Sequence, residues 1–208
     1  MIISHQHRFV FTAIPKTGTH SIRRALREHL GPDDEEQVGL FVQKRLMIPE
    51  LAALGHGHLS LAQIRPFLGE TVFAAYFKFA FVRNPFDRFV SYCAFMTRED
   101  GEFARQPKEV MRRILFEERP IDHLLFVPQH LFVTDAAGRS LADAFGRVED
   151  MQTSYDAFCQ RLNLPTTPLE KVNSSRRGDY RGYYEPALVD GVAALYQRDL
   201  DLFDYAFE

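Results

Sequence analysis

Two short apolar runs in the chain are each followed at once by a helical pattern. Phe9 to Ile14 form a β-rich run that stops at Pro15, and Thr19 to Leu30 then carry apolar residues at helical spacing. Tyr76 to Val82 form a second run, nearly continuously apolar at its end as in a central parallel strand. Each run therefore predicts a strand that ends in a loop before a helix.

Capping residues indicate further helices. Asn84 can cap a helix that has Pro85 in its first turn. Ser60 is a candidate N-cap for a helix within Leu59 to Leu68, directly after the turn Gly55-His56-Gly57-His58. Periodic apolar positions predict three later helices, at Lys108 to Glu118, Glu149 to Leu162 and Pro186 to Asp201.

The order of these elements predicts the fold class. A hairpin-like unit is expected over Leu131 to Val148, with its turn at Asp135 to Gly138. Alternating strands and helices argue for an α/β fold in three layers, with a central, mostly parallel sheet flanked by helices. A chain of 208 residues suits a single domain, residues 1–208, because one core of that size buries most of its apolar surface without splitting.

Charge and cysteine content limit the partners and the compartment. The net charge of -3 gives no overall attraction to nucleic acid or to an anionic membrane, so any anion site must be a local cluster. Cys93 and Cys159 lie in apolar amphipathic stretches, which predicts buried reduced thiols. The first residues lack the pattern of a signal peptide, and no window approaches a membrane-spanning run. We expect a cytoplasmic protein with no nucleic-acid or membrane partner.

The loop after the first apolar run gathers groups that attract anions. Residues 14–21 read Ile-Pro-Lys-Thr-Gly-Thr-His-Ser, at the point where a strand gives way to a helix. Backbone N–H groups and the positive end of the helix dipole attract a phosphate there, Gly18 permits close approach, and Lys16 adds a full charge. In the Walker A pattern the lysine follows the last glycine, whereas Lys16 precedes Gly18, so an ATP-binding kinase is disfavoured.

This loop resembles the 5′-phosphosulfate loop of the sulfotransferases that use 3′-phosphoadenosine 5′-phosphosulfate (PAPS). Those enzymes share the P-loop type of sheet and bind their donor without magnesium. The resemblance therefore implies a P-loop-type fold, PAPS as the cofactor and no metal site. It also implies that the whole loop binds the donor, through Pro15, Lys16, Thr17, Gly18, Thr19, His20 and Ser21.

A second segment, Phe81 to Tyr92, resembles the part of these enzymes that holds the 3′-phosphate. In the family a strand-end arginine and a serine eight residues later bind that phosphate, and the matching positions are Arg83 and Ser91. Arginine offers a planar fork of donors to a phosphate, and Ser91 lies two turns into the predicted helix. A weaker match adds Arg176 and Arg177 as candidate cofactor ligands, with a solvated basic loop as the alternative.

The Gly-His-Gly-His turn resembles the His-Gly-His of the uronyl 2-O-sulfotransferases, in which histidine is the catalytic base. We expect His58 to be the general base, with His56 second and His130 in reserve, because the unperturbed pKa of histidine lies near neutral pH. Lys16 is expected to stabilise the bridging oxygen and the leaving phosphate. The sequence thus predicts an enzyme that transfers a sulfuryl group from PAPS to a hydroxyl.

The acceptor is indicated only by resemblance. The tail from Tyr183 to Phe203 resembles the closing helix of the carbohydrate-type branch, so a carbohydrate is the expected acceptor. Two other functions stay open: a P-loop-type small-molecule kinase, and a non-catalytic module that binds a nucleotide or a carbohydrate. No apolar run ends in an obvious Walker B aspartate, which disfavours the kinase, and Lys16 beside a candidate base disfavours the module. The sequence leaves the oligomeric state open.

Overall fold

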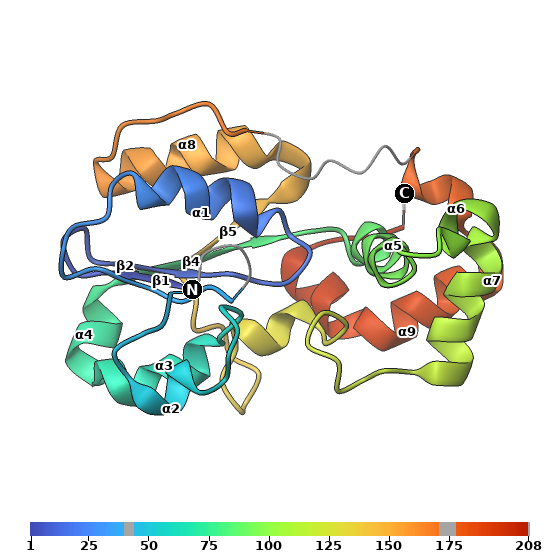
Figure 1. The fold of residues 1–208 in the computed structure, drawn as a ribbon, viewed down its shortest axis with the longest axis horizontal. Helices are drawn as coiled ribbons and strands as arrows, with labels where there is room; N and C mark the ends of the chain where they lie inside the picture. Colours follow the sequence, from blue (N-terminus) through green and yellow to red (C-terminus); the bar gives the residue numbers. More distant parts are fainter. Residues whose placement is uncertain (40–43, 171–177, 208) are drawn as a thin grey trace. The chain divides into compact units, whose positions relative to one another are not determined.

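The computed structural model describes residues 1–39, 44–170 and 178–207. The chain divides into two compact units, which we describe separately (Figure 1). Unit 1 comprises residues 1–82 and 129–173, and unit 2 comprises residues 83–128 and 174–208. Within the described residues, no helix has the length and apolarity needed to cross a membrane.

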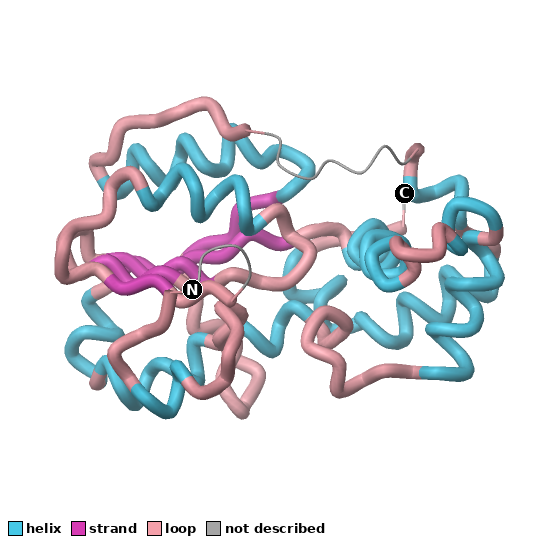
Figure 2. The backbone as a smooth tube through the Cα atoms, viewed as in Figure 1, coloured by secondary structure: helices cyan, strands magenta, loops and turns pink. Residues whose placement is uncertain are grey.

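Unit 1 is built on a sheet of five described strands in the order β3-β1-β2-β4-β5 (Figure 2). The strands are β1 (Ile2–Ser4), β2 (Phe9–Thr12), β3 (Glu35–Glu36), β4 (Phe77–Val82) and β5 (Ala144–Arg147). β4 runs parallel to β2 and β5, whereas β1 runs antiparallel to β2 and β3. The sheet is therefore mixed and not wholly parallel, so the prediction of a mostly parallel sheet is confirmed only in part. Only four residues join β1 to β2, and so short a connection can only form an antiparallel pair.

Helices cover both faces of this sheet (Figure 1). α1 (Thr19–Arg27) and α8 (Met151–Leu162) lie on one face, and α2 (Pro49–Ala52), α3 (Leu61–Leu68) and α4 (Glu70–Ala75) lie on the other. The core under α1 and α8 is rich in aromatic residues, and Phe158 contacts Phe79 with ring centroids 4.7 Å apart. The predicted three-layer α/β arrangement is confirmed within unit 1.

The local predictions in unit 1 are largely confirmed. The two apolar runs form β2 and β4, and α3 begins with a capping box. In that box Ser60 Oγ accepts from the N–H of Gln63 at 3.2 Å, and the Gln63 side chain accepts from the N–H of Ser60 at 2.8 Å. Cys159 of unit 1 and Cys93 of unit 2 are both buried and neither forms a disulfide, as expected. The predicted helix at Glu149 to Leu162 consists of α8 and the preceding 3₁₀ turn η3 (Val148–Asp150).

The predicted hairpin is reduced to its turn. The N–H of Gly138 donates to the carbonyl of Asp135 at 2.9 Å, and only one isolated bridge, Thr134 to Ser140, joins the two described sides. The first side is mostly a 3₁₀ turn, η2 (Gln129–Phe132), and the second becomes β5 in the main sheet. A Cβ atom on Gly146 would lie 2.7 Å from the Phe81 ring, so the glycine allows β5 to pack closely against β4.

Unit 2 is helical. Its described elements are α5 (Pro85–Met96), α6 (Glu102–Arg105), α7 (Pro107–Arg112), the π-helix η1 (Arg113–Glu118), the 3₁₀ turn η4 (Tyr180–Tyr183) and α9 (Pro186–Phe203). The predicted N-cap is confirmed, because the Asn84 side chain accepts from the N–H of Phe86 at 3.0 Å.

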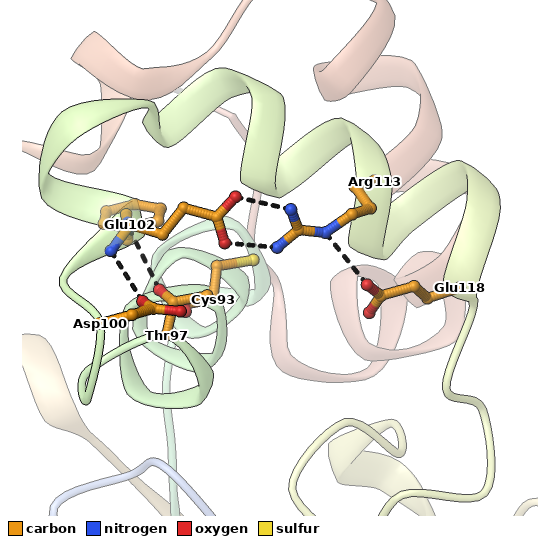
Figure 3. A network of polar contacts seen from close by, with 7 residues as sticks. Cys93, Thr97, Asp100, Glu102, Arg113 and Glu118 are labelled. Carbon is orange, nitrogen blue, oxygen red and sulfur yellow. Dashed lines mark hydrogen bonds and ion pairs between the residues drawn. The ribbon is translucent and has the colours of Figure 1, made fainter.

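In Figure 3 the Arg113 guanidinium joins α6 to η1, with bonds of 2.6 Å to both Glu102 oxygens and 3.0 Å to Glu118.

Candidate active site

The loop from Pro15 to Ser21 connects β2 to α1. Gly18 is the N-cap of α1 and has a φ of 68°, in the left-handed region that favours glycine. A Cβ atom at this position would lie 2.3 Å from Met151 Cε. Because Gly18 has no side chain, it cannot cap the first-turn N–H groups of α1, which point toward the loop. The loop and the positive end of the helix dipole thus meet where an anion would bind.

Two neighbouring residues shape the loop. Lys16 has a φ of 68°, a conformation that costs a residue other than glycine about 1–3 kcal/mol and is concentrated at functional sites. Thr17 is buried, and its hydroxyl donates to the carbonyl of Ile14 at 2.9 Å. That bond commits the Thr17 hydroxyl proton to the loop itself, so the donor that Thr17 would offer to an anion is its backbone N–H.

The Gly-His-Gly-His turn brings His58 to the start of this loop. Nδ1 of His58 lies 2.6 Å from the carbonyl oxygen of Ala13. A carbonyl oxygen can only accept, so Nδ1 carries a proton and donates it. In the neutral ring Nε2 then holds a lone pair, which is the state that a general base needs. The structure therefore brings His58 and the lysine-containing loop together within unit 1.

In the two histidines of the turn, a different ring nitrogen carries the proton. Burial lowers the pKa of His58 to about 3, outweighing the Ala13 hydrogen bond, which raises that pKa. The choice of histidine as base started from its unperturbed pKa, and the fold shifts that pKa because the turn is folded against the protein. Burial also lowers the pKa of His56. The N–H of His58 donates to Nδ1 of His56 at 3.3 Å, so the His56 ring is unprotonated at Nδ1, unlike that of His58.

A buried cation that the sequence analysis missed lies next to the loop. Arg23 of α1 is 4% exposed, and its Nη2 atom is 3.5 Å from Nδ1 of His20. Burial lowers the pKa of Arg23 to about 10, while the charge of Glu36 acts in the opposite direction. Glu36 is itself bound by Arg27, at 2.9 and 2.7 Å. The spacing of three residues between His20 and Arg23 in a predicted helix was the available signal.

In unit 2, Arg83 and Ser91 flank an acidic residue. The Nε and Nη2 atoms of Arg83 donate to one carboxylate oxygen of Asp87, at 2.7 and 2.6 Å. Asp87 and Ser91 lie four residues apart on α5 and share a face of that helix. The guanidinium of Arg83 is therefore directed at the helix face that also carries the buried Ser91.

The remaining predicted site residues are placed as follows. His130 lies in η2, where its carbonyl accepts from the N–H of Thr134 at 3.0 Å and from its hydroxyl at 2.9 Å. Arg83 and Ser91 belong to unit 2, whereas the loop and the three histidines belong to unit 1. Arg176 and Arg177 lie outside the described residues.

Comparison with known proteins gives one match. The family model described as "Sulfotransferase family" matches residues 1–206, a range that includes parts of both units. The search of curated proteins found no match, and the search of solved structures found none either.

Proposed function

Because the chain belongs to the sulfotransferase family, we propose that it transfers a sulfuryl group from PAPS to a hydroxyl of an acceptor, a carbohydrate. The observation that carries the proposal is the His58 ring, with a lone pair on Nε2, tied to the start of the lysine-containing loop. We further propose that residues 1–208 form a single sulfotransferase domain of the P-loop type. The reduced, buried state of both cysteines supports a cytoplasmic location.

The loop in unit 1 fits the sulfate-bearing end of PAPS. Gly18 permits the left-handed backbone at the start of α1, and the first-turn N–H groups of α1 supply donors. Lys16 would neutralise charge on the leaving phosphate, and its left-handed backbone sets the direction of its side chain. PAPS supplies the sulfuryl group when it is bound. The chain supplies the charge, the donors and the base.

For the 3′-phosphate we propose Arg83 and Ser91, with Arg176 and Arg177 as additional ligands. The carboxylate of Asp87 now occupies the donors Nε and Nη2 of Arg83. Two oxygens of a phosphate can accept hydrogen bonds from the same two donors of Arg83. A bound phosphate would therefore replace Asp87 as the partner of Arg83. The buried hydroxyl of Ser91, on the same face of α5, would complete the contact.

His58 would accept the proton of the acceptor hydroxyl at Nε2 while Nδ1 keeps its bond to Ala13. A base whose pKa is about 3 is weak at neutral pH. Negative charge brought to the loop by a bound anion favours the protonated ring and so raises its pKa. An anion in the loop would therefore make Nε2 of His58 a stronger base than it is in the unliganded protein.

The test is to incubate the protein with PAPS and a panel of hydroxyl acceptors, with and without magnesium, and to measure 3′,5′-bisphosphate release. We expect acceptor-dependent release that does not need magnesium and is greatest with carbohydrates. Arg24→Ala is a matched control for Lys16→Ala, because Arg24 is an exposed cation on α1. Transfer from ATP instead of PAPS would favour the kinase, and PAPS binding without transfer to any acceptor would favour the non-catalytic module.

A further inference from the structure

A buried glutamine, Gln37, helps to hold the turn that carries His56 and His58, together with the N-terminal amine of Met1, which donates to the Gly57 carbonyl. This residue follows β3 and is 0% exposed. Its Nε2 atom donates to the carbonyl oxygens of Leu51 at 2.7 Å and His56 at 2.8 Å, and its Oε1 atom accepts from the N–H of Leu46 at 3.1 Å. Carbonyl oxygens only accept and an N–H only donates, so these partners fix the orientation of the amide.

The backbone of Gln37 also packs closely against Gly57, the next residue of the turn. A Cβ atom on Gly57 would lie 2.1 Å from the Gln37 carbonyl oxygen and 3.1 Å from Val38 Cα. Only glycine permits this approach. Gln37 thus contacts two consecutive residues. Its side chain donates to the His56 carbonyl, and its main chain packs against Gly57.

From these contacts we infer that Gln37 is a positioning residue for catalysis, which holds the Gly55–His58 turn so that His58 keeps its hydrogen bond to Ala13 and presents Nε2 as the base. The inference rests on the proposed role of His58. Two hydrogen bonds link Gln37 to Ala13 by way of the turn. The Gln37 amide donates to the His56 carbonyl, and His58, two residues later, donates to the Ala13 carbonyl. Gln37 would act through His58 and is not itself placed against the reacting groups.

The physical reason lies in the His56 carbonyl group. Without the amide of Gln37, the partly buried His56 carbonyl loses this donor, while the Leu51 carbonyl keeps its bond from the N–H of Leu54 at 3.2 Å. Removing a donor from an acceptor that water reaches poorly is costly. The turn would move to bring the His56 carbonyl to water. Because His58 is two residues further on, its ring would then leave Ala13, and the preference for the Nδ1–H tautomer would weaken.

The experiment compares Gln37→Met with Ile64→Val. Ile64 is a fully buried residue of α3 in the same unit, so its truncation lowers stability without removing a hydrogen bond. We would measure kcat, PAP affinity and the ¹⁵N NMR signals of the His58 ring. Gln37→Met should lower kcat by about 10- to 100-fold, the usual effect of losing a residue that orients a functional group. PAP affinity should stay unchanged, and the His58 signals should move toward a mixture of tautomers.

A second variant covers the case in which Gln37→Met does not fold. Gln37→Glu keeps the size of the side chain and the acceptor for Leu46, but its ionised form has no donor. Burial at this position raises the pKa of the new carboxyl above the usual value of about 4.3. Protonation restores one donor, so the kcat of Gln37→Glu relative to the unmutated protein should rise as the pH is lowered from about 8 to about 6.

The inference is overturned if the His58 signals of both Gln37 variants match those of the unmutated protein, or if their kcat falls no further than that of Ile64→Val. The NMR measurement needs no substrate. If His58→Ala keeps full turnover, the proposed base is wrong, while the tautomer signals still decide whether Gln37 positions the ring. The two failures are therefore distinguishable.

Discussion

His58 is tied to Ala13, three residues before Lys16, by a hydrogen bond of 2.6 Å from its Nδ1 atom to the Ala13 carbonyl. The bond couples the Gly-His-Gly-His turn to the loop at the end of β2. It also assigns the two ring nitrogens different tasks, because Nδ1 donates to the backbone and Nε2 keeps the lone pair.

Replacing His58 should abolish turnover and leave the binding of PAP, the desulfated product, unchanged. In His58→Gln the side-chain amide can still donate to Ala13, but it cannot accept a proton, so this variant separates positioning from base catalysis. We expect both His58→Gln and His58→Ala to lose at least about 100-fold in kcat. His56→Ala should have a milder effect. If His58→Ala stays active while His56→Ala or His130→Ala is inactive, another histidine is the base.

The lowered pKa of His58 predicts how stability depends on pH. The folded protein keeps this ring neutral down to about pH 3, whereas an unfolded chain protonates it near pH 6.5. Between those values the unfolded state binds the extra proton, so stability falls as the pH falls, by roughly 1 kcal/mol per pH unit for one proton. Urea unfolding at about pH 7 and about pH 5 should show that His58→Gln loses less stability than the unmutated protein. Equal losses would contradict the assigned pKa.

Lys16→Ala should lower turnover by at least about 100-fold, because one preorganised charge at a developing anion contributes a few kcal/mol. The fold should persist, since Ala can occupy the same left-handed conformation at a similar cost. Turnover and circular dichroism would be measured beside Arg24→Ala, which removes an exposed cation of α1, the helix that follows the loop. Near-normal turnover in a folded Lys16→Ala protein would remove Lys16 from the mechanism.

Arg83 and Asp87 should affect PAP binding in opposite directions. Calorimetry should show PAP binding much more tightly than AMP, which lacks the 3′-phosphate, and Arg83→Ala should remove most of that preference. Asp87→Asn should strengthen PAP binding, because it weakens the ion pair that now engages Arg83 at 2.6 Å. Equal binding of AMP and PAP to the unmutated protein would exclude a 3′-phosphate site.

The sequence by itself determined the local elements of the candidate site. The Pro15–Ser21 loop, the Asn84 cap and the Ser60 cap depend on neighbouring residues, so their residue types predict them directly. The loop's resemblance to sulfotransferases agrees with the family match over residues 1–206. The sequence also placed histidines in the turn before α3, although it could not say what that turn contacts.

The tertiary structure decided the direction of the strands, the state of His58 and the role of the residues around it. β1 and β3, with three and two residues, are too short for a periodic pattern, and the sequence analysis did not predict them. β5 pairs with β4 instead of with a hairpin partner, and that pairing exists only in the folded sheet. The pKa of His58 depends on burial and on the Ala13 carbonyl, 45 residues away. Gln37 likewise acts across 19 residues to reach His56, and such contacts leave no local pattern because they exist only once the chain has folded.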